Sequence, residues 1–123
     1  MKGTENFLDS YALIEILRGN PRYAAIAEYT AVSTVANLVE VAYCLLYEFP
    51  KEKVSEMVNS LGIKVLDVRA DHVMQVAEFR KEHSKKGFSY IDCIGYVLAK
   101  ESRLPFVTGD RQFEGMPNVE FIK

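Results

Sequence analysis

Asn6-Phe7-Leu8-Asp9-Ser10 joins a short apolar run to two residues that favour the start of a helix. Residues 11–17 continue with the apolar spacing of a helix, and Gly19-Asn20-Pro21 ends it. The segment therefore predicts a strand followed directly by a helix. This unit is the basic repeat of folds with a parallel sheet.

The same alternation continues along the chain. Further strands are expected at residues 30–32, 63–68, 105–108 and 119–122, and further helices at 22–29, 33–48, 51–61, 71–85 and 90–102. This order predicts a three-layer α/β/α sandwich around a mainly parallel sheet of four to five strands. We find no internal repeat, linker or low-complexity segment, so residues 1–123 are expected to form a single domain.

Composition excludes several classes of protein. The chain is 49% hydrophobic and 26% charged, as in ordinary globular domains. Its longest uncharged run, Tyr29 to Val39, has 11 residues, whereas a membrane-spanning helix needs about 18. Glu5 and Asp9 place negative charges in the N-terminal segment, which argues against a signal peptide, so we expect a cytoplasmic protein.

The cysteines and histidines show no metal-binding spacing. Cys44 and Cys93 are far apart within apolar stretches and are expected to be buried and reduced. His72 and His83 lie among the charged residues of one predicted helix, so we expect both at the surface. A zinc site is therefore not predicted.

Three aspartates are expected at one edge of the sheet. Asp9 follows the first strand, Asp110 follows a late strand, and Asp92 lies in the first turn of its helix. Ligands of parallel sheets bind beyond the carboxyl ends of the strands, where these residues converge. Taken singly, each also has a structural explanation, since Asp9 suits a helix cap, Asp92 a capping box with Ser89, and Asp110 a turn.

Glu40 is the only charged residue between Tyr29 and Tyr47. Apolar side chains surround it in most directions of the predicted helix, which indicates a buried helix and a buried carboxylate. A buried carboxylate needs an ion pair, a proton or a metal, and the sequence leaves these open. Asn37 lies on the same helical face and is expected to hydrogen-bond to Glu40.

Several carboxylates from separate elements suit Mg²⁺ or Mn²⁺, which prefer hard oxygen ligands. Such ions generate a hydroxide nucleophile and screen a phosphodiester during hydrolysis.

Four short motifs carry a family resemblance. They are Phe7-Leu8-Asp9-Ser10, Asn37-Leu38-Val39-Glu40, Ser89-Tyr90-Ile91-Asp92-Cys93-Ile94 and Val107-Thr108-Gly109-Asp110-Arg111-Gln112-Phe113. In motif order and in length, over essentially the whole chain, they resemble PIN-domain ribonucleases and in particular the VapC toxins of type II toxin–antitoxin pairs.

The resemblance implies a metal-dependent endoribonuclease that uses Mg²⁺ or Mn²⁺ and has an antitoxin partner. Its metal-binding and catalytic acids would be Asp9, Glu40, Asp92 and Asp110. Ser10 and Thr108 match polar positions that orient ligands or water, a supporting task expected also of Asn37. Many relatives carry a further acid where this chain has Gln112, so the number of metals is open.

Basic and aromatic residues suggest partners. Lys100, Arg103 and Arg111 are expected to flank the acidic edge and to contact RNA phosphates. Arg80, Lys81, Lys85 and Lys86 are attributed mainly to a favourable helix C-terminus, with a Glu82–Lys86 pair. The N-terminal half is rich in aromatic residues, and most of them are expected in the core. By analogy with the family, an excess implies a homodimer face or an antitoxin groove, and these residues are Tyr11, Tyr23, Tyr29, Tyr43, Tyr47 and Phe49.

Two alternatives remain open. One is a catalytically inactive PIN fold that acts as a binding module, a hypothesis that Gln112 favours. The other is a phosphoacceptor regulatory domain with Asp67 as acceptor, although Asp9 has no acidic neighbour and residues 104–110 hold no lysine. The net charge of −2 does not exclude RNA, because 15 basic and 17 acidic residues become 15 and 13 without the four proposed ligands, a net charge of +2.

Overall fold

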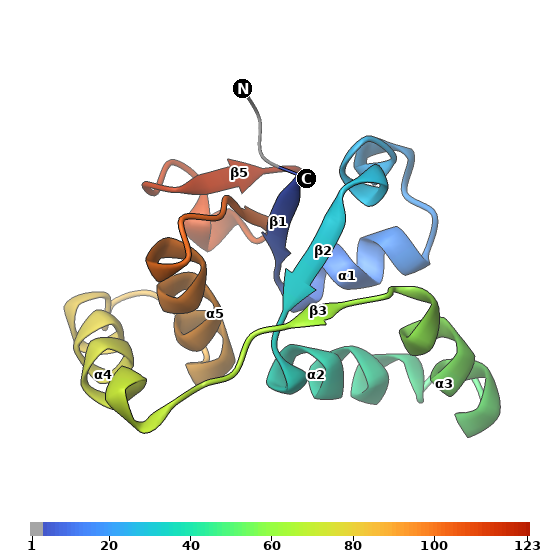
Figure 1. The fold of residues 1–123 in the computed structure, drawn as a ribbon, viewed down its shortest axis with the longest axis horizontal. Helices are drawn as coiled ribbons and strands as arrows, with labels where there is room; N and C mark the ends of the chain where they lie inside the picture. The colour runs from blue at the N-terminus through green and yellow to red at the C-terminus, as the bar shows by residue number, and fades with distance from the viewer. Residues whose placement is uncertain (1–3) are drawn as a thin grey trace.

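Residues 4–123 are described by a computed structural model in which one parallel sheet lies between two layers of helices (Figure 1). Met1 to Gly3 of the predicted domain lie outside the described residues. The strands are β1 (Glu5–Leu8), β2 (Thr30–Ser33), β3 (Lys64–Val65), β4 (Phe106–Thr108) and β5 (Val119–Phe121). The helices are α1 (Ser10–Leu17), α2 (Val35–Leu45), α3 (Lys51–Ser60), α4 (Val73–Glu82) and α5 (Tyr90–Glu101).

The strand order β3-β2-β1-β4-β5 creates a switch point in the sheet. The chain builds outward from β1 through β2 to β3 and then returns to place β4 on the other side of β1, where Leu8 is paired with Val107. In an open parallel sheet, the crevice beyond the carboxyl ends of two such strands is the preferred ligand site. Asp9 directly follows β1, and Asp110 lies two residues after the end of β4.

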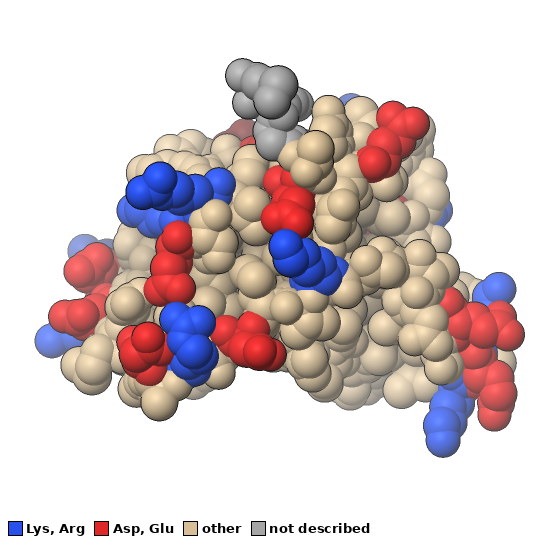
Figure 2. Space-filling view, viewed as in Figure 1, with Lys and Arg blue, Asp and Glu red and all other residues tan. Residues whose placement is uncertain are grey.

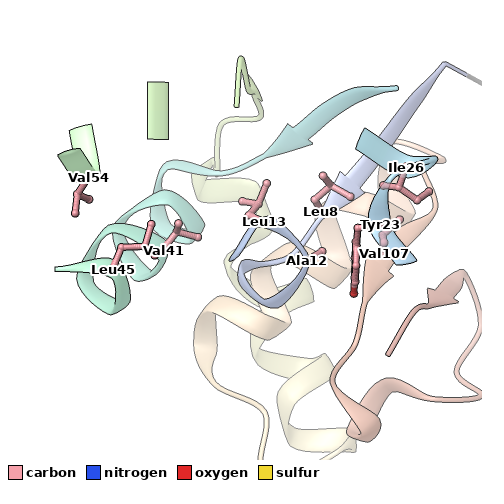
Figure 3. Packing of buried hydrophobic residues seen from close by; sticks show 9 residues of the cluster. All are labelled: Leu8, Ala12, Leu13, Tyr23, Ile26, Val41, Leu45, Val54 and Val107. Atoms are coloured by element: carbon pink, nitrogen blue, oxygen red, sulfur yellow. The ribbon is translucent and has the colours of Figure 1, made fainter. Parts of the chain in front are cut away.

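Alternating side chains give the sheet two buried faces. Leu8 and Val107 pack against α1, α2 and α3, where Figure 3 shows Leu13 and Val41 in the same cluster. Phe7 and Phe106 point to the other face and pack with Cys93 and Tyr96 of α5. The predicted three-layer α/β/α architecture is therefore confirmed, with α4 and α5 on one side and α1 to α3 on the other (Figure 1).

Several predicted boundaries are wrong. Residues 22–29 form two short 3₁₀ turns, Pro21–Tyr23 and Ile26–Glu28, in which only Tyr23 and Ile26 are buried. The next helix begins after Thr34, whose hydroxyl accepts a hydrogen bond from the Asn37 N–H. Ser33 is instead the last residue of β2, and its hydroxyl donates to the Leu8 carbonyl. The strand expected at 63–68 shortens to the two residues of β3 at the sheet edge.

The helix expected at 71–85 is also shorter and turned differently. A 3₁₀ turn, Ala70–His72, precedes α4, and Phe79 rather than Val73 contacts the core. His72 is fully buried, contrary to expectation, because its Nε2 bonds to a Glu101 carboxylate oxygen at 2.9 Å and its Nδ1 accepts from the Arg69 N–H. His83 is half-buried.

One face of α2 is open to solvent, so the expectation of a fully buried helix is wrong. Its inner residues Asn37, Val41 and Leu45 are buried. The exposed residues on and just after this helix are largely apolar, and they are Val35, Val39, Tyr43, Cys44, Leu46 and Tyr47. The prediction of a buried Cys44 is wrong for the same reason, whereas Cys93 is buried as predicted.

On the face shown in Figure 2, acidic and basic side chains are interspersed, as the small net charge leads one to expect. Within residues 4–123, none of the helices combines the length and the apolar character that crossing a membrane requires.

Candidate functional site

Asp9 lies at the centre of the carboxyl edge, between the end of β1 and the start of α1. It is the N-cap of α1, and its Oδ1 accepts a hydrogen bond from the Ala12 N–H at 2.9 Å. The Thr108 hydroxyl, at the end of β4, donates to the other carboxylate oxygen. Asp9 is only 4% exposed. The first turn of α1 and the end of β4 thus fix this carboxylate in one orientation.

Thr108 also connects Asp9 to Asp110. Its hydroxyl accepts a hydrogen bond from the Asp110 N–H at 3.0 Å while it donates to Asp9. The Asp110 carboxylate in turn caps a 3₁₀ turn (Arg111–Phe113) by accepting the Gln112 N–H at 3.0 Å. A single hydroxyl therefore sets the relative position of the two aspartates at the switch point.

Asp92 is held by the capping box that the sequence predicts. The Ser89 N–H donates to Asp92 Oδ2 at 2.8 Å, and the Asp92 N–H donates to Ser89 Oγ at 3.0 Å. The box also sets the first residue of α5, which begins at Tyr90. Structural and functional explanations of these aspartates are thus compatible, because the caps orient the carboxylates at the edge of the sheet.

The carboxylates at this edge interact electrostatically. Burial raises the pKa of Asp9 to about 7, the Thr108 and Ala12 hydrogen bonds oppose this, and the charges of Asp92 and Asp110 add to it. Burial likewise raises the pKa of Asp92, to which Asp110 and Glu40 contribute by repulsion. Mutually repelling carboxylates in a partly buried site favour either a proton or a cation.

Glu40 reaches the site through α1. The Ser10 hydroxyl donates to Glu40 Oε1 at 2.6 Å and accepts from Asn37 Nδ2 at 3.0 Å. Thr34 completes the chain by donating to Asn37 Oδ1 at 2.7 Å. The predicted direct bond between Asn37 and Glu40 is therefore replaced by a relay through Ser10.

Sequence reasoning missed the part that Thr34 takes in this relay. The signal available was its spacing, since Thr34 stands three residues before Asn37, as an N-cap does before the residue it caps.

The donor set suits a hard divalent cation, although the carboxylates are spread out. Among residues 4–123, no three His, Cys, Asp or Glu side chains lie close enough together to hold a metal ion as they stand. In the same part of the chain, no ion pair with lysine or arginine is found for the four acids at this edge. Carboxylates that repel one another and lack basic partners fit Mg²⁺ or Mn²⁺, which also keep several water ligands.

Comparison with known families decides the identity of the fold. The model of the PIN domain matches residues 7–119. The chain belongs to the PIN domain family. Comparison with curated proteins gives no match.

Solved structures share the PIN architecture at low sequence identity. A toxin–antitoxin complex from Klebsiella pneumoniae has 17% identity and a TM-score of 0.75, and the match covers 94% of this chain and 95% of that one. VapC20 of Mycobacterium tuberculosis, a sarcin–ricin loop cleaving toxin, has 16% identity and a TM-score of 0.77 over 95% and 98%. VapBC2 of Rickettsia felis, bound to a promoter DNA fragment, has 18% identity and a TM-score of 0.74, and the match covers 97% of this chain and 99% of that one.

Gln112 has a defined place in this PIN domain. Besides its N–H contact, its side-chain amide donates to Asp110 Oδ2 at 3.4 Å, and its Oε1 accepts from the Gly87 N–H. This neutral side chain thus ties Asp110 to the loop between α4 and α5.

The basic residues are distributed differently from the prediction. Lys100 lies at the last turn of α5 and Arg103 just beyond it, so Lys100 is about 12 Å along the helix axis from Asp92. Arg111 directly follows Asp110 and forms an exposed pair with Glu114 at 3.7 Å. Of the three basic residues that were predicted to contact RNA phosphates, Arg111 is therefore the one that lies beside an acid of the site.

The loop between α4 and α5 also carries basic residues to the carboxyl edge. The expected Glu82–Lys86 helical pair does not form, because α4 ends at Glu82. Lys86 Nζ donates instead to the Gln112 carbonyl. Lys86, which sequence reasoning attributed to a helix terminus, therefore lies against the turn that holds Asp110.

Proposed function

We propose that this PIN domain is a metal-dependent endoribonuclease and the toxin of a type II toxin–antitoxin pair. The observation that carries the proposal is the convergence of Asp9, Asp92 and Asp110 at the switch point of the sheet. The charges of Asp92 and Asp110 raise the pKa of Asp9, and the charge of Asp110 also raises the pKa of Asp92. Membership of the PIN family and the VapC-like fold support it.

In the proposed site, Asp9, Glu40, Asp92 and Asp110 hold Mg²⁺ or Mn²⁺. When bound, the ion lowers the pKa of a water molecule and neutralises charge that develops on the phosphodiester. Thr108 and Ser10 orient the carboxylates of Asp9 and Glu40 by hydrogen bonds. Such supporting contacts commonly change metal affinity or activity by about 10- to 100-fold.

RNA cleavage with and without Mg²⁺ tests this proposal. Asp92→Asn keeps an oxygen that can accept the Ser89 N–H but removes the charge, so it is expected to abolish cleavage while the helix cap persists. Asp9→Asn is expected to abolish it as well. Asp71→Asn serves as a matched control because Asp71 is exposed and pairs with Arg69 outside the site. Full activity of Asp92→Asn and Asp9→Asn would contradict the assignment.

An antitoxin is the proposed protein partner, and the solved complexes of similar folds support it. The exposed apolar face of α2, with Val39, Tyr43 and Tyr47, offers a surface for it or for a second copy of this chain. Both RNA and antitoxin imply a cytoplasmic protein. Light scattering of the protein alone tests the homodimer, and Tyr47→Glu is expected to shift a dimer towards monomer; an unchanged dimer would place the interface elsewhere.

A catalytically inactive PIN fold is the second candidate, and the Gln112 amide on Asp110 favours it. In that case the protein would bind RNA without cleaving it, or would bind a protein partner. The phosphoacceptor hypothesis has less support, because Asp67 follows the edge strand β3, two strands away from β1. Labelling by acetyl phosphate would revive it.

A further inference from the structure

Arg80 and Tyr90 form an exposed stacked pair at the carboxyl edge. The Arg80 guanidinium carbon lies 4.3 Å from the centroid of the Tyr90 ring. Arg80 comes from the last turn of α4 and Tyr90 is the first residue of α5, so the loop between the helices brings them together. Sequence reasoning assigned Arg80 to its helix terminus and gave Tyr90 no role outside its motif.

The pair contributes little to the core. Tyr90 is 67% exposed even though the guanidinium covers part of its ring, so much of the ring remains open to solvent. Arg80 is exposed too, and within residues 4–123 no carboxylate forms an ion pair with it. An open aromatic face and an uncompensated guanidinium are therefore available to a ligand.

Tyr90 lies in the same first turn of α5 as Asp92. Tyr90 precedes Asp92 by two residues, which is about 3 Å along the helix axis, and the two side chains leave α5 in different directions. Contacts from Gln112 to Gly87 and Lys86 hold the intervening loop against the turn of Asp110.

We propose that Tyr90 and Arg80 form a subsite for single-stranded RNA, in which Tyr90 stacks on a nucleobase close to the cleaved bond and Arg80 binds an adjoining phosphate. This inference rests on the proposed ribonuclease function. Unpaired bases stack on aromatic rings whatever their identity, and guanidinium groups bind phosphate oxygens in a bidentate manner. The pair would therefore add affinity and fix the strand relative to the acids without a strong base preference.

Binding of a fluorescent single-stranded RNA tests the subsite, with Asp92→Asn as the common, cleavage-deficient background and Mg²⁺ present. Loss of one base–aromatic stack weakens binding by roughly 5- to 150-fold. Tyr90→Ala is therefore expected to lower the RNA affinity by a factor in that range, whereas Tyr90→Phe is expected to retain it. Arg80→Gln is expected to lower the slope of log affinity against log salt by about 0.7, the value of one phosphate contact on a single strand, and Tyr90→Ala leaves that slope unchanged.

Two exposed positions distant from the edge supply controls. Met74→Ala removes an exposed apolar side chain near the start of α4, and Arg22→Gln removes an exposed charge from a 3₁₀ turn, so neither is expected to change RNA binding. A 2-aminopurine placed at successive RNA positions gives a second signal, because stacking on Tyr90 quenches its fluorescence at one position. That quenching is expected to disappear in Tyr90→Ala.

The outcomes separate the two proposals. If the wild-type protein cleaves RNA and Tyr90→Ala binds as tightly as its background, the subsite is wrong and the function stands. If Tyr90→Ala loses binding and the wild-type protein never cleaves, the subsite stands and the ribonuclease proposal is wrong. If the wild-type protein neither binds nor cleaves single-stranded RNA, both are wrong.

Discussion

Asp9→Asn is predicted to stabilise the protein at high pH in the absence of metal. Burial raises the pKa of Asp9 from 3.8 to about 7, so the folded protein retains a proton that the unfolded chain loses between these values. The stabilising contribution of the protonated Asp9 is therefore fully present below pH 3.8 and is lost as the pH rises from 3.8 through 7. Because one pKa unit corresponds to about 1.4 kcal/mol, ionising Asp9 costs up to about 4 kcal/mol.

Asparagine removes this ionisation. It can still accept the Ala12 N–H, whereas its contact with Thr108 must reverse direction, at a cost of about 1 kcal/mol. In EDTA, the variant is thus expected to match the wild type to within about 1 kcal/mol at pH 5 and to be more stable by about 3 kcal/mol at pH 8.5.

Urea unfolding between pH 5 and 9 measures this directly, as the difference in free energy of unfolding between wild type and variant. Asp71→Asn is the control, because Arg69 lowers the pKa of the exposed Asp71 and its difference is expected to stay flat over this range. A difference for Asp9→Asn that also stays flat would refute the reasoning, since Asp9 would then carry its charge at no cost to folding.

Three further predictions follow from single contacts. Ser10→Ala removes the hydroxyl between Asn37 and Glu40 and is expected to lower RNA cleavage by about 10- to 100-fold, with Ser84→Ala as the exposed control; equal activities would exclude the relay. Ser89→Ala removes a helix cap and is expected to lower the free energy of unfolding by about 1 kcal/mol, whereas an unchanged midpoint in urea would contradict the capping energy. A thiol reagent at pH 8 is expected to modify the exposed Cys44 in the folded protein. It is expected to react with Cys93, whose pKa burial raises to about 11, only after unfolding, and rapid modification of both cysteines in the folded protein would contradict this.

The features that the sequence predicted correctly are local or follow from strand order. The helix start after Asp9 and the Ser89–Asp92 box depend on residues within three positions of each other, so spacing suffices to find them. The placement of Asp9 and Asp110 beyond the ends of the neighbouring strands β1 and β4 follows from parallel strands, whose carboxyl ends share one edge. These rules need no knowledge of tertiary packing.

The features that were missed depend on contacts between distant segments. His72 is buried because Glu101, on a different helix, supplies its hydrogen-bond partner. The family resemblance, rather than a local pattern, assigned Glu40 to the acidic edge, and its contact there depends on the packing of α1 on α2, which brings the Ser10 hydroxyl within hydrogen-bond distance. The outer face of α2 is exposed although its composition is that of a buried helix, and no local pattern distinguishes a face covered by the same chain from one left for a partner.

Calorimetric titration with Mn²⁺ tests the central claim most directly, namely that the acids at the switch point of the sheet form a divalent-cation site. The wild-type protein is expected to bind Mn²⁺, and Asp110→Asn, which keeps an oxygen to accept the Gln112 N–H but loses the charge, is expected to bind far more weakly. Equal binding by both proteins, or no binding by the wild type in the millimolar range, would contradict the account.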